Sequence, residues 1–166
     1  MPEPWNFETF LTDTAPALTG YCTAIAGISH GEDAAQEAFV RLWQHREKIP
    51  NEAAAAVFVY RTAYRLCVDA LRQGNRQRAA EKRKQQEEAL QRADCRSHRL
   101  SDRMLHALQT LSPADRAIVY SRVLEEADYG QIASRFGKSE TWARKRYSLA
   151  RKKLKQILGK EKKHER

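Results

Sequence analysis

Cysteine is scarce in this chain of 166 residues, which has only three copies, at Cys22, Cys67 and Cys95. The three are odd in number, widely spaced and outside any CxxC pair, which argues against a disulfide framework and against a zinc cluster. We therefore interpret them as reduced thiols. Cys95 and His98 could form half of a metal site, but two such residues in a polar segment are more often a coincidence. We expect no bound metal.

Long apolar runs are missing as well. No run approaches the roughly 20 residues that span a bilayer, and the opening MPEPWNFETF lacks a charged stretch followed by an apolar one. These absences predict a cytoplasmic protein that is not stably inserted in a membrane.

A catalytic set is also missing. The five histidines are scattered, and the sequence has no glycine-rich phosphate loop, no GxSxG and no pair of carboxylates in an apolar context. We therefore predict a protein that is not an enzyme, binds no cofactor and has no small-molecule substrate.

Positive charge is abundant by contrast. The formal net charge is +9 and the sequence pI is about 9.7. Such a balance favours polyanionic partners, and without a membrane segment nucleic acid is the better candidate.

Helix-favouring residues dominate the long periodic stretches, where glycine and proline are rare, and no segment is a credible strand. The periodicity predicts three helices in the first half, at about residues 5–27, 31–48 and 53–73. Ser29 and Glu32 have the spacing of a capping box for the second of these helices.

The segment 74–100 has few large apolar side chains and cannot bury a core face, so it is interpreted as a charged linker, either irregular or partly helical. The predicted fold is thus all-α, with two small helical domains joined by a flexible charged linker. The predicted domains are a helical bundle at 1–73, the linker at 74–100, a second helical domain at 101–158 and a frayed basic tail at 159–166.

The second domain has the start and stop signals of a helix-turn-helix. In SPAD, Ser112 can cap a helix, Pro113 suits its first position, and Asp115 suits its positive end; this helix should run to about Glu126. Next, DYGQIASRFGKSE predicts a short helix, with one apolar face, that ends in a left-handed turn at Gly137 before Ser139 caps the last helix. The apolar face consists of Tyr129, Ile132, Ala133 and Phe136.

The last helix combines an apolar stripe with a cationic face. The stripe consists of Ala143, Tyr147, Ala150, Leu154 and Ile157. Pointing away from it, or flanking that direction, are Thr141, Arg144, Lys145, Ser148, Arg151, Lys152 and Lys155. Such a helix fits the major groove of DNA, where these side chains reach phosphates and base edges. A solvated cationic helix is the alternative, but the preceding turn favours DNA. Trp142, at the edge of the stripe, is expected to pack rather than contact bases.

The second predicted helix offers a surface of mixed polarity. Its buried face is predicted to contain Ala35, Ala38, Phe39, Leu42 and Ile49. Its outward side chains are Asp33, Gln36, Glu37, Arg41 and Gln44, with Trp43 at the margin. From composition alone, an ordinary solvated face is a better interpretation than a protein-binding site.

The third predicted helix interleaves aromatic and basic side chains. Its apolar stripe is predicted to be Val57, Tyr60, Tyr64, Cys67, Val68 and Leu71. The residues Phe58, Arg61, Thr62, Arg65 and Arg72 lie largely off that stripe. Aromatic rings can stack unpaired bases while guanidinium groups hold phosphates, so Phe58 with Arg61 and Arg65 suggests single-stranded or melting DNA. The two tyrosines are expected in the core.

With these residues in view, the chain resembles a bacterial extracytoplasmic-function (ECF, group IV) sigma factor of the major RNA polymerase sigma family. EDAAQEAFVRLW and FVYRTAYRLCVDALR resemble the second conserved region of that family. LQTLSPADRAIVYSRVLEEADYGQIASRFGKSETWARKRYSLARKKLK resembles its fourth region. The order of these segments and the charged interval between them make the resemblance specific.

The resemblance implies a factor that binds core RNA polymerase and directs promoter recognition and opening, often under the control of an anti-sigma factor. Carried over residue by residue, it implies three sets of contacts. Those with core polymerase fall to Asp33, Gln36, Glu37, Phe39, Leu42 and Trp43. Those with the minus-ten element, as duplex and melted strand, fall to Phe58, Arg61, Thr62, Arg65 and Arg72. Those with the minus-thirty-five element fall to Ser139, Thr141, Arg144, Lys145, Ser148, Arg151 and Lys152.

The sequence departs from the family pattern at several of these places. Phe58 stands where Trp is general, Arg65 where Asn is common, Lys138 at a usually aliphatic position and Trp142 where Thr is usual. Two other functions fit the residues alone: a dimeric helix-turn-helix regulator that binds an operator without polymerase, and an all-helical adaptor for acidic proteins.

Overall fold

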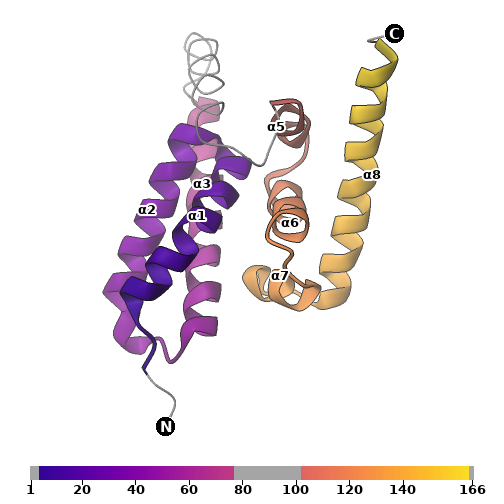
Figure 1. Cartoon of the computed structure of the whole chain (residues 1–166). Coiled ribbons are helices and arrows are strands. Elements are labelled where there is room, and N and C mark those ends of the chain that lie inside the picture. The colour runs from indigo at the N-terminus through magenta and orange to yellow at the C-terminus, as the bar shows by residue number, and fades with distance from the viewer. Residues whose placement is uncertain (1–3, 77–101, 165–166) are drawn as a thin grey trace. The chain divides into compact units, whose positions relative to one another are not determined.

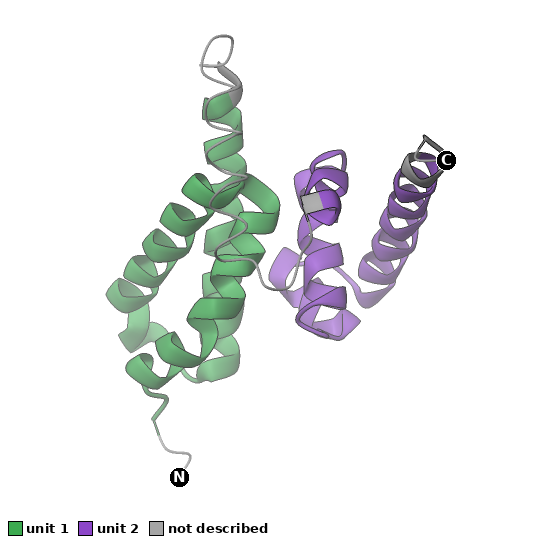
Figure 2. Cartoon of the chain, turned by 45° about the horizontal axis from the view of Figure 1, so that its top comes forward, with its two compact units in different colours: residues 1–82 green, residues 83–166 purple. Residues whose placement is uncertain are grey.

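The computed structural model describes residues 4–76 and 102–164, and every regular element within these ranges is a helix (Figure 1). The chain divides into two compact units, residues 1–82 and 83–166 (Figure 2). This agrees with the predicted all-α fold in two small domains. Most of the predicted linker, with Cys95 and His98, lies outside the described residues. No helix in the described ranges is both long and apolar enough to cross a membrane.

Unit 1 is built from three long helices that lie side by side (Figure 1). These are α1 (Phe7–Ala26), α2 (Ile28–His45) and α3 (Glu52–Arg76), with a 3-10 turn, η1 (Arg46–Lys48), after α2. Asn6 caps α1 by accepting a hydrogen bond from the backbone N–H of Thr9 at 3.0 Å. The helix α3 continues through Gly74, where the sequence suggested the start of the linker.

The start of α2 differs from the prediction. A capping box at Ser29 was expected, but α2 already begins at Ile28, directly after Gly27, so Ser29 lies inside the helix. Gly27 has φ 87° and ends α1 as well, because its N–H donates to the carbonyl of Thr23 at 2.9 Å. Glycine tolerates this positive φ, so the chain can turn at this one residue and α2 can begin at the next, without a capping box.

The core of unit 1 combines large side chains of α1 with small ones of α2 and α3. Leu18, Tyr21, Cys22 and Ile25 of α1 are fully buried. They pack with a larger set from the other helices, namely Ala35, Ala38, Leu42, Ala55, Val59, Ala63 and Cys67. The predicted stripe of α3 is therefore partly wrong. Tyr60 and Cys67 are buried, but Val57, Tyr64, Val68 and Leu71 are only half-buried, because Ala55, Val59 and Ala63 line the helix contacts. Cys22 and Cys67 are free thiols.

Unit 2 contains α5 (Asp102–Gln109), α6 (Pro113–Val123), α7 (Tyr129–Phe136) and α8 (Glu140–His164). The predicted caps at Ser112 and Ser139 are confirmed: their hydroxyls accept from the N–H of Asp115 at 3.3 Å and of Trp142 at 3.1 Å. Two predicted bounds are wrong. The helix α6 ends at Val123 rather than Glu126, which has φ 53°, and α8 continues as a helix to His164 instead of fraying after Leu158.

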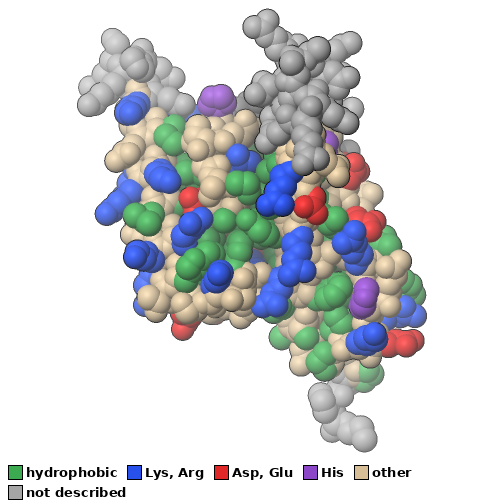
Figure 3. Space-filling view, turned by 180° about the vertical axis from the view of Figure 1, so that it is seen from behind, with side chains coloured by type: hydrophobic (Ala, Val, Ile, Leu, Met, Phe, Trp, Pro, Cys, Tyr) green, Lys and Arg blue, Asp and Glu red, His purple; other side chains and the backbone are tan. Residues whose placement is uncertain are grey.

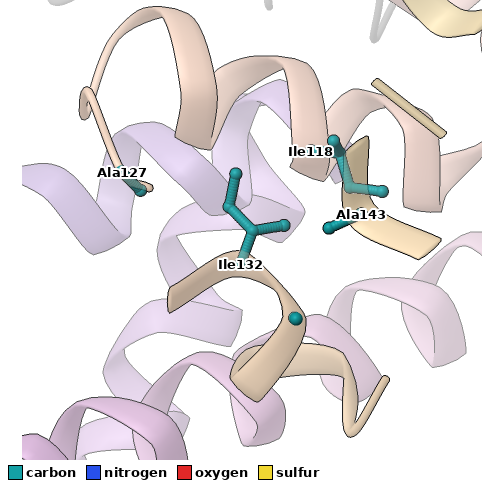
Figure 4. Packing of buried hydrophobic residues seen from close by; sticks show 5 residues of the cluster. Ile118, Ala127, Ile132 and Ala143 are labelled. Carbon is teal, nitrogen blue, oxygen red and sulfur yellow. The ribbon is translucent and has the colours of Figure 1, made fainter. Parts of the chain in front are cut away.

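A small apolar cluster holds the last three helices together. Ile118 of α6, Ala127 of the following loop, Ile132 and Ala133 of α7 and Ala143 of α8 form one buried cluster, in which Ile132 lies between Ala127 and the pair of Ile118 and Ala143 (Figure 4). The rings of Tyr129, Phe136, Trp142 and Tyr147 pack against this cluster from its edge. Trp142 thus packs as expected, with its ring centroid 5.4 Å from that of Phe136.

Two arginine side chains join neighbouring elements of unit 2. The Arg135 guanidinium lies 2.7 Å from the Glu125 carboxylate and donates to the Ser121 hydroxyl at 3.0 Å. The Arg116 guanidinium donates to three carbonyls at the end of α5, those of Leu108, Gln109 and Leu111. Burial lowers the pKa of Arg116, although a guanidinium stays protonated at any working pH.

Candidate nucleic-acid interface

The exposed face of α8 is the clearest candidate for contact with nucleic acid. All seven residues predicted for it, Ser139, Thr141, Arg144, Lys145, Ser148, Arg151 and Lys152, are exposed. On the opposite side, Ala143, Ala150 and Leu154 of the predicted stripe are buried, whereas Tyr147 and Ile157 are only half-buried. Lys and Arg side chains line the edge of unit 2 along α8, at the left of Figure 3. The helix therefore presents cationic side chains outward from a fixed apolar base.

The turn before α8 sets its direction. Gly137 adopts the left-handed conformation, with φ 63° and ψ 36°, as predicted. On the other side of the turn, α7 begins with a full capping box. The Asp128 carboxylate accepts from the N–H of Gln131 at 2.7 Å, and the Gln131 side chain accepts from the N–H of Asp128 at 3.1 Å. Both helices of the helix-turn-helix thus have defined ends.

A second ionic contact fixes the rotation of α8 about its own axis. Arg146 of α8 lies 3.1 Å from the buried carboxylate of Asp115 at the start of α6. The sequence suggested only that Asp115 interacts with the end of its own helix. The cost of desolvating this carboxylate is offset by the Arg146 pair.

The Arg144 side chain contacts an aromatic ring of the neighbouring helix α7. Its guanidinium carbon is 5.1 Å from the centroid of the Tyr129 ring, and that of Arg122 is 4.4 Å from the same centroid. Such contacts reduce the rotamer freedom that Arg144 would lose on binding a phosphate or a base. Arg122 was not singled out from the sequence, because nothing local marks its contact with Tyr129.

The α2 residues predicted to bind polymerase include both exposed and buried side chains. Asp33, Gln36 and Glu37 are exposed, and Glu37 pairs with Arg41 at 3.1 Å. The exposed fractions of Phe39 and Leu42 are only 8% and 0%. These two residues can therefore support the exposed side chains from the core, but they cannot touch a partner unless the unit rearranges.

Like Val40, which is 48% exposed, Trp43 is a large apolar side chain of α2 with much of its area, 47%, exposed. The Arg46 guanidinium covers its ring at 3.6 Å from the centroid, and the ring of Phe7 approaches it at 4.9 Å. Arg46 also donates to the Trp43 carbonyl at 2.7 Å. Phe7 and Arg46 were missed from the sequence, since their contact with Trp43 depends on how α1 meets the end of α2.

The residues predicted for the minus-ten element follow one side of α3. Phe58, Arg61 and Thr62 are half-buried, and Arg65 and Arg72 are exposed. The ring of His45, at the end of α2, lies 5.5 Å from the ring of Phe58. The two rings form an aromatic pair next to the basic residues. His45 was missed from the sequence, because only the fold brings the end of α2 to the start of α3.

Together these features define a helix-turn-helix DNA-binding protein that carries a separate three-helix unit. Comparison with known families identifies both units. The model of sigma-70 region 2 matches residues 7–77, and the model of sigma-70 region 4 matches residues 101–154. The chain therefore belongs to the sigma-70 family.

The fold is also similar to a solved structure. In the co-crystal structure of the sigma factor RpoE in complex with the anti-sigma factor NepR from Bartonella quintana, the matching chain is 16% identical to this one. The match covers 92% of this chain and 96% of that chain with a TM-score of 0.67. No curated protein sequence gives a match. As a sigma factor, the protein binds core RNA polymerase and promoter DNA in transcription initiation, and it is not an enzyme.

Proposed function

We propose that the two units divide promoter recognition between them, with α8 reading the minus-thirty-five element as duplex DNA. The observation that carries this proposal is the exposure of all seven candidate side chains, of which Ser139 caps α8 and the other six lie on the side opposite its buried stripe or flank that side. Arg and Lys can hydrogen-bond guanine edges in the major groove, and Ser and Thr can contact bases or phosphates. The repulsion among cations in the free protein becomes attraction when phosphates lie between them.

The side of α3 with Phe58, Arg61, Thr62, Arg65 and Arg72 would capture the minus-ten element as its strands separate. The pairing of His45 with Phe58, at 5.5 Å between ring centroids and 40° between ring planes, supports this role, because it adds a second aromatic ring beside the one on which an unpaired base can stack. The exposed guanidinium groups of Arg65 and Arg72 would hold the backbone of the same strand.

The exposed face of α2 would dock on core polymerase. Trp43 is the candidate anchor, since a half-exposed Trp beside a rim of Asp33, Gln36 and Glu37 has the arrangement of an interface hot spot. Phe39 and Leu42 would act indirectly by holding α2 against α1 and α3. Docking would also join two weak DNA contacts into one assembly, in which each raises the effective concentration of the other.

Control by an anti-sigma factor is part of the same proposal. The similar chain from Bartonella quintana is described in complex with the anti-sigma factor NepR. For the present protein we expect a protein inhibitor that covers one of the docking surfaces in the cytoplasm, where core polymerase and promoter DNA are found.

Reconstituted transcription tests the proposal as a whole. Core polymerase, this protein and a template that carries the upstream region of its own gene should give a transcript that is absent without the protein. An operator-binding regulator would instead protect that DNA without polymerase and would yield no transcript. Initiation that is independent of this chain would overturn the proposal.

Replacing Lys145 or Arg144 by Ala should weaken recognition of the upstream element and leave polymerase binding unchanged. The expected loss is about 1 to 3 kcal/mol on the cognate promoter if the side chain reads a base. If it contacts only a phosphate, the loss should be similar on all sequences. The slope of the logarithm of the binding constant against the logarithm of the salt concentration should then decrease in magnitude by about one. Holoenzyme binding to promoter fragments at several salt concentrations distinguishes these two cases.

Two matched variants control this experiment. Lys160→Ala removes the same charge from an exposed position far along α8 and should leave sequence preference unchanged. Trp43→Ala should have the opposite effect, weakening polymerase binding while binding of the free protein to duplex DNA persists. Equal loss of polymerase binding in Lys145→Ala and Trp43→Ala would contradict the proposed division between the units.

A further inference from the structure

Leu149 is an exposed apolar residue on the helix that carries the cationic face. Half of its area, 50%, is exposed, although most large apolar side chains of unit 2 are buried or half-buried. It follows Lys145 by four residues, which places it one turn further along α8 and about 40° around the helix axis. Lys152 and Lys153, the next residues on this side, are also exposed. Leu149 therefore lies at the border of the cationic face, not at the buried stripe.

Single exposed leucines are common on protein surfaces and need no explanation by themselves. The position of Leu149 is informative because of its neighbours. Ser148 and Leu149 lie between Lys145 and Lys152 along α8, one on each side of the line that joins them, so a helix that enters the major groove with these lysines also brings Leu149 towards the base edges. Leucine has no hydrogen-bonding group, so it cannot satisfy the acceptors of guanine or the amino groups of cytosine and adenine. The thymine methyl is the apolar group that the groove offers.

We propose that Leu149 contacts the C5-methyl group of a thymine in the upstream promoter element and makes thymine the preferred base at one position. The inference rests on the proposed function of α8 as the upstream reader. It goes further in assigning an apolar specificity contact to a face otherwise defined by charge. Leu149 would add a preference for thymine to the phosphate and base-edge contacts of Lys145 and its cationic neighbours.

The test uses the holoenzyme and a promoter library with a randomised upstream element. The unaltered protein should select thymine at one position at least. Replacing that thymine by uracil removes only the methyl group, and this change should weaken holoenzyme binding by about fourfold, the value for one methyl group withdrawn from an apolar contact. Leu149→Ala should bind the thymine promoter about as weakly and should no longer distinguish thymine from uracil.

Val123→Ala is the matched control, because Val123 is an apolar residue of the same unit with 55% exposure but lies at the end of α6. It should keep the full response to uracil. Alanine favours helix, so Leu149→Ala should fold normally, which circular dichroism can verify.

Two results would overturn the inference and leave the proposed function intact. One is a selected upstream element in which no thymine responds to uracil. The other is a Leu149→Ala protein that responds to uracil as strongly as the unaltered one. A holoenzyme that selects no upstream sequence at all would contradict the upstream role of α8 as well, and the inference with it.

Discussion

Replacing Gly31 by Ala should destabilise unit 1 by about 1 to 3 kcal/mol, the range expected for overpacking. A Cβ atom at Gly31 would lie 2.6 Å from the backbone nitrogen of Thr23 and 2.7 Å from its Cα. Both atoms belong to the backbone of α1, so no side chain can move aside. The helices α1 and α2 would have to separate, and the contacts of Cys22 and Ile25 with α2 would loosen.

Gly159→Ala makes the same chemical change in α8, where a Cβ atom would meet nothing within 4 Å. Alanine is the better helix former by about 1 kcal/mol, so this variant should be neutral or slightly stabilising. The indole N–H signals of the tryptophans give separate probes in one NMR sample, since Trp5 and Trp43 report on unit 1 and Trp142 on unit 2. Urea unfolding of Gly31→Ala should shift the first two signals only.

This experiment also bears on function. The docking surface on α2 depends on its position against α1, and Phe7 of α1 packs on Trp43 at 4.9 Å. Gly31→Ala should therefore weaken polymerase binding although residue 31 is buried and contacts no partner. If unit 1 of Gly31→Ala unfolds at the same urea concentration as unit 1 of the unaltered protein, the approach of α1 and α2 at this glycine does not limit the size of the side chain at position 31.

The sequence was most informative where structure depends on local chemistry. The phase of α8 follows from apolar residues at steps of three and four, and the left-handed turn at Gly137 follows from the residue type. Ser112 and Ser139 follow from the preference of hydroxyl side chains for helix starts. Each of these features is decided by residues close together in the chain, so no knowledge of the packing is required.

The features that could not be predicted depend on how the helices pack. In α3, large residues such as Val57 and Val68 suggested the buried stripe, but close helix contacts favour small side chains, and Ala55 and Ala63 occupy them. Ser29 looked like a cap, yet Gly27 turns the chain two residues earlier. The contacts of His45 with Phe58 and of Arg46 and Phe7 with Trp43 join segments whose proximity only the fold establishes. Candidate sites could therefore be predicted as helix faces, but not the residues that complete them.

The second prediction with a large expected effect on stability concerns the buried pair of Arg135 and Glu125. Their side chains are 13% and 9% exposed and lie 2.7 Å apart, and Arg135 also donates to the buried Ser121 hydroxyl. Arg135→Ala would leave the Glu125 carboxylate buried without this cation. Removing one partner of a buried pair costs about 3 to 5 kcal/mol, which approaches the total stability of a small domain. The Trp142 signal should then show unit 2 largely unfolded, while Trp5 and Trp43 remain native.

The double variant Arg135→Met with Glu125→Leu separates the cost of an unpaired charge from the net value of the pair. Replacement of both partners by apolar groups of similar size is often neutral, because the desolvation of two ions then disappears together with their attraction. We expect the double variant to regain most of the lost stability and, with α7 and α8 again in place, recognition of the upstream element. A double variant as unstable as Arg135→Ala would mean instead that the hydrogen bond to Ser121 and the packing of the Arg135 stem hold α7, and that the ionic contact with Glu125 contributes little.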